Sequence, residues 1–230
     1  PSVHLGLRMQ SVRILYEDAN LVAFDKPFDA VEKDVIQTLS SKGVQQVIFP
    51  EFPDEMELAA SGVVFAAKNA NSAKRLREKL DYGYVTKSYL ALLQGTLEER
   101  VLIKRQGENS QTIIDPLGWG SYLGQSCTYV RLVPRRGRRH LLKVHSDYAG
   151  HPILGDETFC DPQLTAQVER IMLHSQSVTI RDDSPWRSYT DRYGHSHEKE
   201  IRIEAINAVV HYVDDLELSA TQARSRYCDW

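Results

Sequence analysis

Residues 52–80 read FPDEMELAASGVVFAAKNANSAKRLREKL, and this stretch decides the fold because it contains a turn, an apolar run and an amphipathic segment in succession. Ser61-Gly62 favours a turn, and residues 63–67 form an apolar run that is too short for a helix. In residues 71–80 the apolar side chains recur at helical spacing, while lysines and arginines take the remaining surface. Either Asn69 or Asn71 can cap this helix. The stretch therefore predicts a turn, a buried strand and a helix.

An acidic cluster of Asp54, Glu55 and Glu57 lies just before this turn. A carboxylate at the end of a buried strand can act as a nucleophile or general base if a cation keeps it ionised. Three acids beside a turn are also typical of an ordinary solvated loop. On these residues alone, both interpretations of Glu57 stay open.

The composition is that of a globular protein, with 230 residues, 42% hydrophobic and 26% charged, which excludes disordered and collagen-like classes. The three cysteines lack CxxC spacing, so we expect reduced thiols in an intracellular compartment. No apolar run reaches the length of about 18 residues that spans a bilayer, and we expect no membrane partner. The chain begins at Pro1 rather than methionine, so we expect an upstream piece such as a transit peptide, and a mitochondrial location.

The rest of the chain predicts many short strands and few helices. We expect strands in residues 11–26 as a hairpin, 84–93, 101–105, 127–134, 141–144, 172–180 and 201–205, a strand or edge at 44–49, helices at 31–39 and 163–170, loops at 106–124, and a polar excursion at 181–199. No regular βαβ spacing is present, so the fold class is α+β, with a largely antiparallel mixed sheet flanked by helices and loops. We expect one domain over residues 12–206, an N-terminal extension over 1–11, and a tail over 207–230 that is a helix on the body or a mobile segment.

A basic stretch, RLVPRRGRRHLLKVH, occupies residues 131–145 and contains no acid, although the whole chain has a net charge of −3. A local positive patch attracts phosphates whatever the total charge is. If residues 138–145 form a strand, alternation places Arg139 and Lys143 on one face and His140 on the other. The stretch is either a phosphate site or an exposed basic hairpin.

The chain lacks the sequence motifs that bind nucleotide cofactors or metal ions. The chain contains neither a P-loop nor a GxGxxG motif, and His195, His197 and His211 lack the spacing of a zinc site. We therefore expect no cofactor and no metal ion.

A series of motifs in order resembles the RluA-type family of pseudouridine synthases, which isomerise uridine in structured RNA by breaking the glycosidic bond and rejoining it to carbon. The resemblance covers about residues 12–206: residues 14–27 resemble the family's LYED…LLVVNKP, 58–69 its HRLDxxTSGLLLxAKN, 85–91 its VxKxYxA, 132–156 its LxPxTGRTHQIRxH…GHPIxGD, and 172–174 its LHA. The resemblance implies a pseudouridine synthase-like catalytic domain.

The resemblance also assigns site residues. The family's catalytic aspartate falls on Glu57, its pocket tyrosine and leucine fall on Tyr89 and Leu173, and the basic partner of the carboxylate, an arginine in the family, falls on Lys143. The family's arginine that helps to open the RNA falls on Glu55, which reverses a charge where RNA approaches. Tyr89 is then expected to stack on a flipped base, although a strand tyrosine on its own is usually a core residue.

Two functions follow from these departures. The first is an RNA-binding pseudoenzyme, a ribosomal RNA-binding assembly factor whose partners include ribosomal or assembly-factor proteins. The second is a working synthase on rRNA or tRNA with Glu57 in place of the aspartate. Under both, we expect the RNA backbone to be bound by five residues of the basic stretch, which are Arg135, Arg136, Arg138, Arg139 and His140.

Overall fold

The structure is a computed structural model that describes residues 12–28, 30, 32–49, 60–104, 110–135, 141–182, 189–190, 196–197, 199–205 and 214–218. Its helices are α1 (Glu32–Ser41), α2 (Ala70–Asp81), α3 (Leu141–Tyr148) and α4 (Pro162–Thr165). Its strands are β1 (Arg13–Glu17), β2 (Leu21–Lys26), β3 (Ser61–Ala67), β4 (Val85–Gln94), β5 (Val101–Lys104), β6 (Gln111–Tyr122), β7 (Gln125–Arg135), β8 (Leu173–Asp182), β9 (Tyr189–Thr190), β10 (Ser196–His197), β11 (Lys199–Glu204) and β12 (Asp214–Leu218).

One sheet of ten strands organises the described residues, in the order β1-β2-β3-β8-β4-β7-β6-β12, with β11 paired to β8 and β5 paired to β6. The pairs are antiparallel except β3 with β8, which is parallel. This arrangement confirms the expected α+β class with a largely antiparallel mixed sheet. No helix in the described ranges is long and apolar enough to cross a membrane.

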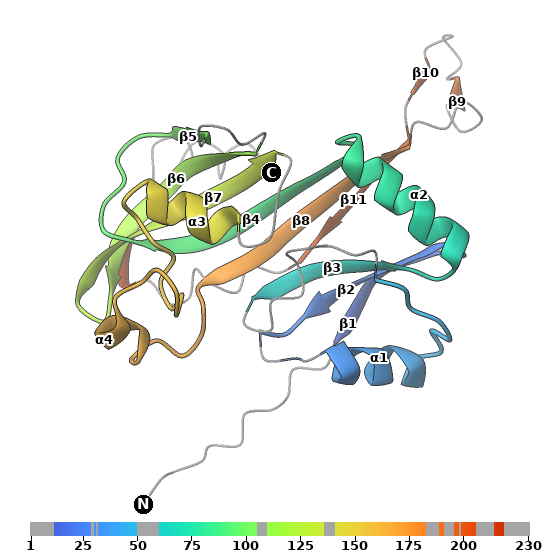
Figure 1. Ribbon diagram of the computed structural model, residues 1–230, viewed down its shortest axis with the longest axis horizontal. Coiled ribbons are helices and arrows are strands. Elements are labelled where there is room, and N and C mark those ends of the chain that lie inside the picture. Colours follow the sequence, from blue (N-terminus) through green and yellow to red (C-terminus); the bar gives the residue numbers. More distant parts are fainter. Residues whose placement is uncertain are drawn as a thin grey trace, which may run out of the picture.

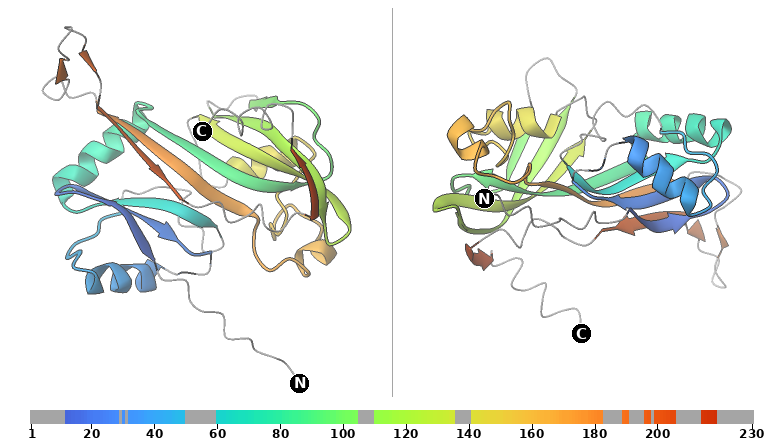
Figure 2. Two further views of the ribbon diagram at one scale, coloured as in Figure 1. Left: turned by 180° about the vertical axis from the view of Figure 1, so that it is seen from behind. Right: turned by 90° about the horizontal axis from the view of Figure 1, so that it is seen from below.

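The long strands β4 and β8 run through the middle of the molecule (Figure 1). At one end lie β1, β2 and β3 with α1 and α2, and at the other lie β5, β6 and β7 with α3 and α4. The view from behind in Figure 2 shows the same division, and the short β9–β10 pair projects beyond the ends of β8 and β11. The central strands β4 and β8 therefore join the group of elements around β1–β3 to the group around β5–β7.

The stretch that predicts turn, strand and helix folds as expected. Every residue of β3 is buried, and α2 begins after Asn69, whose side-chain oxygen accepts the backbone N–H of Ser72 at 2.9 Å. This bond satisfies one of the amide groups that a helix start leaves without an intrahelical partner. Leu76 is the buried residue of α2, so the lysines and arginines of the helix face outward.

Two apolar clusters cover the β2–β3 end of the sheet. Phe24 packs with Val35 and Leu39 of α1, whereas Phe65 packs with Leu76 of α2. All five side chains are buried. Burying each one fully stabilises the fold by about 1.5–3 kcal/mol, which exceeds the intrinsic helix propensity of segments as short as α1 and α2.

Two expectations about loops and termini are wrong. Residues 106–124 were expected to be loops, but β6 pairs with β7 along its whole length, with an irregularity between Pro116 and Gly118. A proline and glycines are tolerated there because the irregularity releases one ladder position. Within the expected tail over 207–230, β12 pairs with β6 instead of forming a helix. Both strands depend on partners that are distant in sequence.

Smaller differences concern two other segments. Residues 44–49 form no strand in the described structure, and Ile48 joins the sheet through an isolated bridge to Ala67. The expected helix at 163–170 is the short α4, whose start is capped by the Asp161 side chain. Within the expected polar excursion at 181–199, β9 and β10 pair as a two-stranded sheet.

We predict that Gly62→Ala strongly destabilises the protein. Gly62 has φ of +107°, and a Cβ added there would lie 2.2 Å from the carbonyl oxygen of Ser175 on β8. The variant should lose about 3 kcal/mol or more of unfolding free energy in urea denaturation, since a positive φ and a backbone clash act together. The control Gly83→Ala, at φ of +76° with nothing within 4 Å, should lose about 1 kcal/mol. Equal losses would contradict the close approach of β3 and β8.

Candidate functional site

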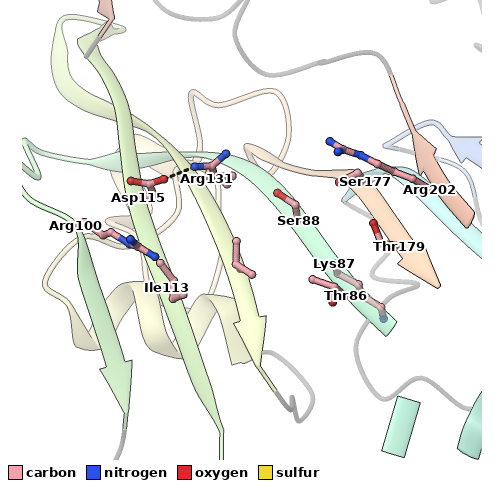
Figure 3. A pocket seen from close by; sticks show the side chains of 11 residues that line it. Thr86, Lys87, Ser88, Arg100, Ile113, Asp115, Arg131, Ser177, Thr179 and Arg202 are labelled. Carbon is pink, nitrogen blue, oxygen red and sulfur yellow. Dashed lines mark hydrogen bonds and ion pairs between the residues drawn. The ribbon is translucent and has the colours of Figure 1, made fainter. Parts of the chain in front are cut away.

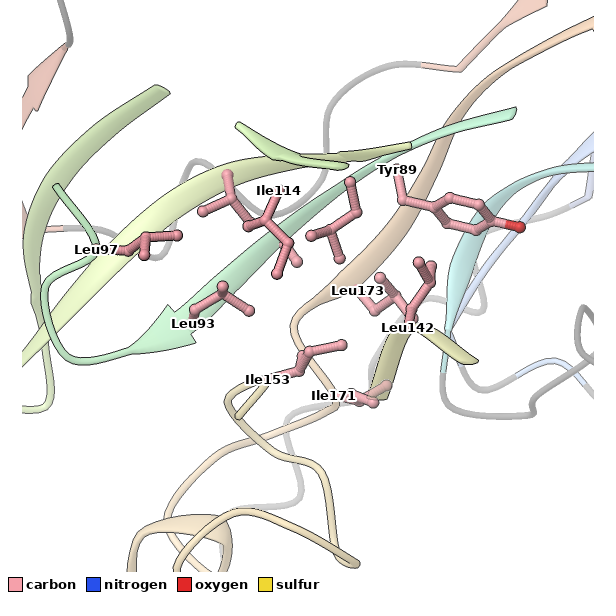
Figure 4. Close-up of a cluster of buried hydrophobic side chains, with 11 residues drawn as sticks. Tyr89, Leu93, Leu97, Ile114, Leu142, Ile153, Ile171 and Leu173 are labelled. Atoms are coloured by element: carbon pink, nitrogen blue, oxygen red, sulfur yellow. The ribbon is translucent and has the colours of Figure 1, made fainter. Parts of the chain in front are cut away.

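Tyr89 and Leu173 lie in one apolar cluster in the middle of the sheet. Tyr89 on β4 pairs with Ser175 on β8 and with Leu132 on β7. Leu142 of α3 packs into the same cluster. Figure 4 shows the Tyr89 ring beside Leu142 and Leu173, with its hydroxyl at the outer end of the group. The structure thus brings together the two pocket residues that the resemblance assigned.

The other expected site residues belong to two segments, 50–59 and 136–140, that lie outside the described residues. The first described residues after each segment pack at or near this cluster. Ala60, the first described residue after 50–59, packs against the cluster. Leu141 and Leu142 directly follow residues 136–140. The residues expected there lie outside the described residues, and they are Glu57, Arg136, Arg138, Arg139 and His140. Arg135 is described and is exposed at the end of β7, opposite Gln111.

Residues 141–148 form a helix, so the expectation of a strand at 141–144 is wrong. Leu141, Leu142, His145 and Ser146 are buried, which is the i, i+1, i+4, i+5 spacing of one helix face. The expected alternation of Arg139 and Lys143 on one strand face therefore does not apply. His145 anchors α3 to β6, because its Nδ1 lies 2.9 Å from the Thr112 hydroxyl oxygen.

Lys143 points into the protein and forms an ion pair with Asp156. Its Nζ lies 3.3 Å from Asp156 Oδ1, and the side chains are 10% and 0% exposed. Asp156 Oδ1 also accepts the backbone N–H of Thr158 at 3.0 Å. A buried ammonium needs a carboxylate nearby to offset the cost of its desolvation. Among the described residues, Asp156 supplies such a carboxylate to Lys143. The sequence reasoning assigned no role to Asp156, although it ends the Gly-His-Pro-Ile-Leu-Gly-Asp motif that the resemblance used.

A second buried polar group joins the starts of β3 and β8. Arg170 Nη2 donates to the Ser61 hydroxyl at 2.5 Å and to the Leu173 carbonyl at 3.1 Å. Ser61 Oγ lies 2.9 Å from His174 Nδ1. Since a guanidinium only donates, the Ser61 oxygen accepts from Arg170 and its hydroxyl proton is available to His174. Arg170 therefore holds Leu173 against the first residue of β3. No sequence pattern singled out this arginine.

The described residues contain no group of three or more histidine, cysteine, aspartate or glutamate side chains that could hold a metal ion. His195 and His211, considered from the sequence, lie outside the described residues.

This chain is similar to known RNA pseudouridine synthases. The family model described as RNA pseudouridylate synthase matches residues 46–148. The Dual-specificity RNA pseudouridine synthase RluA of Haemophilus ducreyi is 26% identical over 192 residues, covering 72% of this chain and 85% of that protein. The family model and the relatives support an RluA-type family of pseudouridine synthases for this chain.

A second relative, the Ribosomal large subunit pseudouridine synthase C of Buchnera aphidicola, is 30% identical over 194 residues; the match covers 72% of this chain and 62% of that protein. Among solved structures, Human RNA Pseudouridylate Synthase Domain Containing 1 matches with a TM-score of 0.72 and 22% identity over 96% of both chains. The pseudouridine synthase fold expected from the sequence is confirmed.

We predict that Lys143→Met lowers the unfolding free energy by about 3–5 kcal/mol, because it leaves the Asp156 carboxylate buried without its cation. The double variant Lys143→Met with Asp156→Asn should regain more than half of that loss, since no buried charge remains. Urea denaturation measures both.

Lys68→Met is the matched control for this pair. Lys68 pairs with Glu17 at 2.7 Å, with side chains 23% and 36% exposed, and its loss should cost about 1 kcal/mol or less. Equal destabilisation in the single and double Lys143 variants would show that the ion pair is not what the lysine contributes.

Proposed function

We propose that this chain binds ribosomal RNA through its pseudouridine synthase fold, does not isomerise uridine, and acts as a ribosome assembly factor. One combination of features carries the proposal. The pocket residues Tyr89 and Leu173 are assembled beside the helix that carries Lys143, yet the sequence has Asp54, Glu55, Met56 and Glu57 at the positions of the family's His-Arg-Leu-Asp.

RNA binding is supported by the family and by the charge of one segment. The relatives named above are an RNA pseudouridine synthase and a ribosomal large subunit pseudouridine synthase. In this chain, arginines gather in residues 135–139, between the end of β7 and the start of α3. Arginine guanidinium groups form charge-assisted bonds with phosphate oxygens. The segment therefore supplies cations of the kind that an RNA backbone needs, and it directly precedes α3, whose Leu142 packs into the Tyr89 cluster.

Loss of catalysis is supported by the altered acidic set. Glutamate is one methylene longer than aspartate, and a displacement of about 1 Å in a reacting group costs about 10²-fold in rate. Glu55 adds a negative charge beside Glu57, which disfavours the ionised carboxylate and repels phosphate. Lys143 offers one compact ammonium, already 3.3 Å from Asp156, where arginine would offer a fork that can bind two carboxylates.

An active synthase is the second candidate, and the retained pocket favours it. Tyr89 and Leu173 still pack together, and Arg170 still holds Leu173 in place. In this mechanism Glu57 attacks the sugar or the base of uridine in rRNA or tRNA, and Lys143 keeps the Glu57 carboxylate ionised. Tyr89 stacks on the flipped base, as enzymes that act on bases require.

We predict that the purified chain forms no pseudouridine when incubated with ribosomal RNA, as measured by mass spectrometry of the digested RNA. The variant Glu57→Asp with Glu55→Arg should gain turnover, because it restores the shorter carboxylate and the cation. The rate of pseudouridine formation by the unaltered chain should lie below that of this variant by about 10²-fold or more. Pseudouridine made by the unaltered chain and abolished in Glu57→Ala would establish the active synthase instead. The assembly role predicts co-sedimentation of the chain with precursor ribosomal particles.

We also predict that changing Arg135, Arg136, Arg138 and Arg139 together to alanine weakens RNA binding. Each phosphate contact contributes about 0.7–0.9 to the slope of log Kd against log salt, so the slope should fall by about 3. Fluorescence anisotropy with a labelled ribosomal RNA fragment measures it. Arg13→Ala, an exposed arginine on β1 paired with Asp25, is the control and should leave the slope unchanged. Unaltered affinity of the fourfold variant would contradict a role for the basic segment.

A further inference from the structure

A hollow of about 380 Å³ lies over β4 and β8, apart from the Tyr89 cluster (Figure 3). Successive residues of a strand point to opposite faces. On β4, Ser88 lines the hollow while Tyr89 lies in the core cluster, and on β7, Arg131 lines it while Leu132 lies in the cluster. These alternating side chains place the hollow on the sheet face opposite the candidate site, with the thickness of the sheet between them, and Lys87, between Thr86 and Ser88, also lines the hollow.

Hydroxyl groups form the centre of this surface. Ser88 pairs with Ser177, and Thr86 pairs with Thr179, across the antiparallel β4–β8 ladder. Directly opposite residues are separated by about 5 Å, and alternate residues along a strand by about 7 Å. All four side chains line the hollow, so it presents a compact grid of hydroxyl groups on two central strands.

The same face of β4 changes character where the hollow ends. Two positions further along, Leu90 and Leu92 are buried by Leu154 and Leu164 in an apolar cluster. Central strands usually carry apolar residues on a face that another layer covers. Here the hydroxyl groups stand where that cover stops: Thr86 is exposed, Ser88 and Thr179 are half-buried, and Ser177 is buried between the strands.

Three arginines from different elements surround the grid. Arg100 directly precedes β5, Arg131 is on β7 and Arg202 is on β11. Figure 3 shows Arg202 extending toward Ser88, with Arg131 on the far side of the hollow. The residues come from distant parts of a chain whose net charge is −3, so this concentration of positive charge is local.

The ion pairs around the hollow leave capacity for an anion. Arg131 pairs with Asp115, and Arg202 pairs with Glu204 at 2.5 Å, both in exposed settings where such pairs contribute little. Each guanidinium has five N–H donors, so one carboxylate does not saturate it. Arg100 forms no hydrogen bond or ion pair with any residue in the described ranges.

Guanidinium groups together with serine and threonine hydroxyls are the donors that contact phosphates in nucleic-acid complexes. No aromatic side chain is among the described residues that line the hollow, so the surface lacks the stacking platform that holds bases. Its chemistry fits the backbone of a nucleic acid rather than its bases.

We propose that this hollow, with Arg100, Arg131 and Arg202 around the Ser88 and Ser177 hydroxyls, is a second RNA contact that binds backbone phosphates. The proposal rests on the proposed function, in which the chain binds RNA. A phosphate held there is on the other face from Tyr89, so it adds affinity and fixes the path of the RNA without taking part in chemistry.

The test is the double variant Arg100→Ala with Arg202→Ala, measured by fluorescence anisotropy of a labelled large-subunit ribosomal RNA fragment over a salt series. Both arginines are exposed, so the fold should be preserved. The slope of log Kd against log salt should fall by about 1.4–1.8, which corresponds to two phosphate contacts. The matched control is Arg13→Ala with Arg77→Ala, two exposed arginines in ion pairs outside the hollow, and it should keep the original slope.

The outcomes separate this proposal from the function on which it rests. If the unaltered chain binds no RNA, the proposed function fails and the second contact fails with it. If the chain binds RNA and the hollow variant keeps the original slope, or loses no more than the control, only the second contact is overturned. Inorganic phosphate that shifts the arginine Nε–H NMR signals, together with an unaltered RNA slope, would assign the hollow to a small phosphate ligand and also overturn the proposal.

Discussion

The structure depends on the contact between the first residues of β3 and β8. Ser61 and His174 are 113 residues apart in sequence, and their side chains meet at 2.9 Å. Gly62 lets the two backbones approach, because any Cβ there would collide with Ser175. Arg170 then ties Ser61 to the Leu173 carbonyl. This contact joins the β1–β3 end of the sheet to the rest, and it sets where the chain resumes after residues 50–59.

Two of the residues that the resemblance assigns to the site, Tyr89 and Leu173, also hold the fold together. Tyr89 and Leu173 are 9% and 5% exposed and belong to the largest apolar cluster of the described residues. Each stabilises the fold by about 1.5–3 kcal/mol through burial alone. Their retention is therefore required by packing whether or not uridine is isomerised. The acidic positions Asp54, Glu55 and Glu57, which precede β3 and lie outside the described residues, are where the sequence departs from the family motif.

Local signals predicted much of the fold, and pairing between distant segments accounts for the errors. The β3–α2 stretch folds as predicted because the spacing of its apolar residues, its turn and its helix cap are all local to the stretch. The strand β6 was missed because its proline and glycines are accommodated by pairing with β7. The start of helix α3, residues 141–144, was mistaken for a strand because so short a segment with two leucines fits both strand and helix periodicity. The packing of α3 against β6 decides for the helix. Of the candidate site, the motifs singled out Tyr89 and Leu173, which lie in one apolar cluster, whereas Arg170 and Asp156 were not identified as partners.

The sequence by itself determined the type of most elements and the resemblance to a family, because backbone periodicity, turns and ordered motifs are properties of neighbouring residues. Only the tertiary structure decided that Lys143 faces Asp156, that Arg170 braces Leu173, and that arginines from β7, β11 and the start of β5 surround one grid of hydroxyls. The physical reason is that these contacts join residues far apart in the chain. Their distances are set by strand order and by helix packing, which no local pattern encodes.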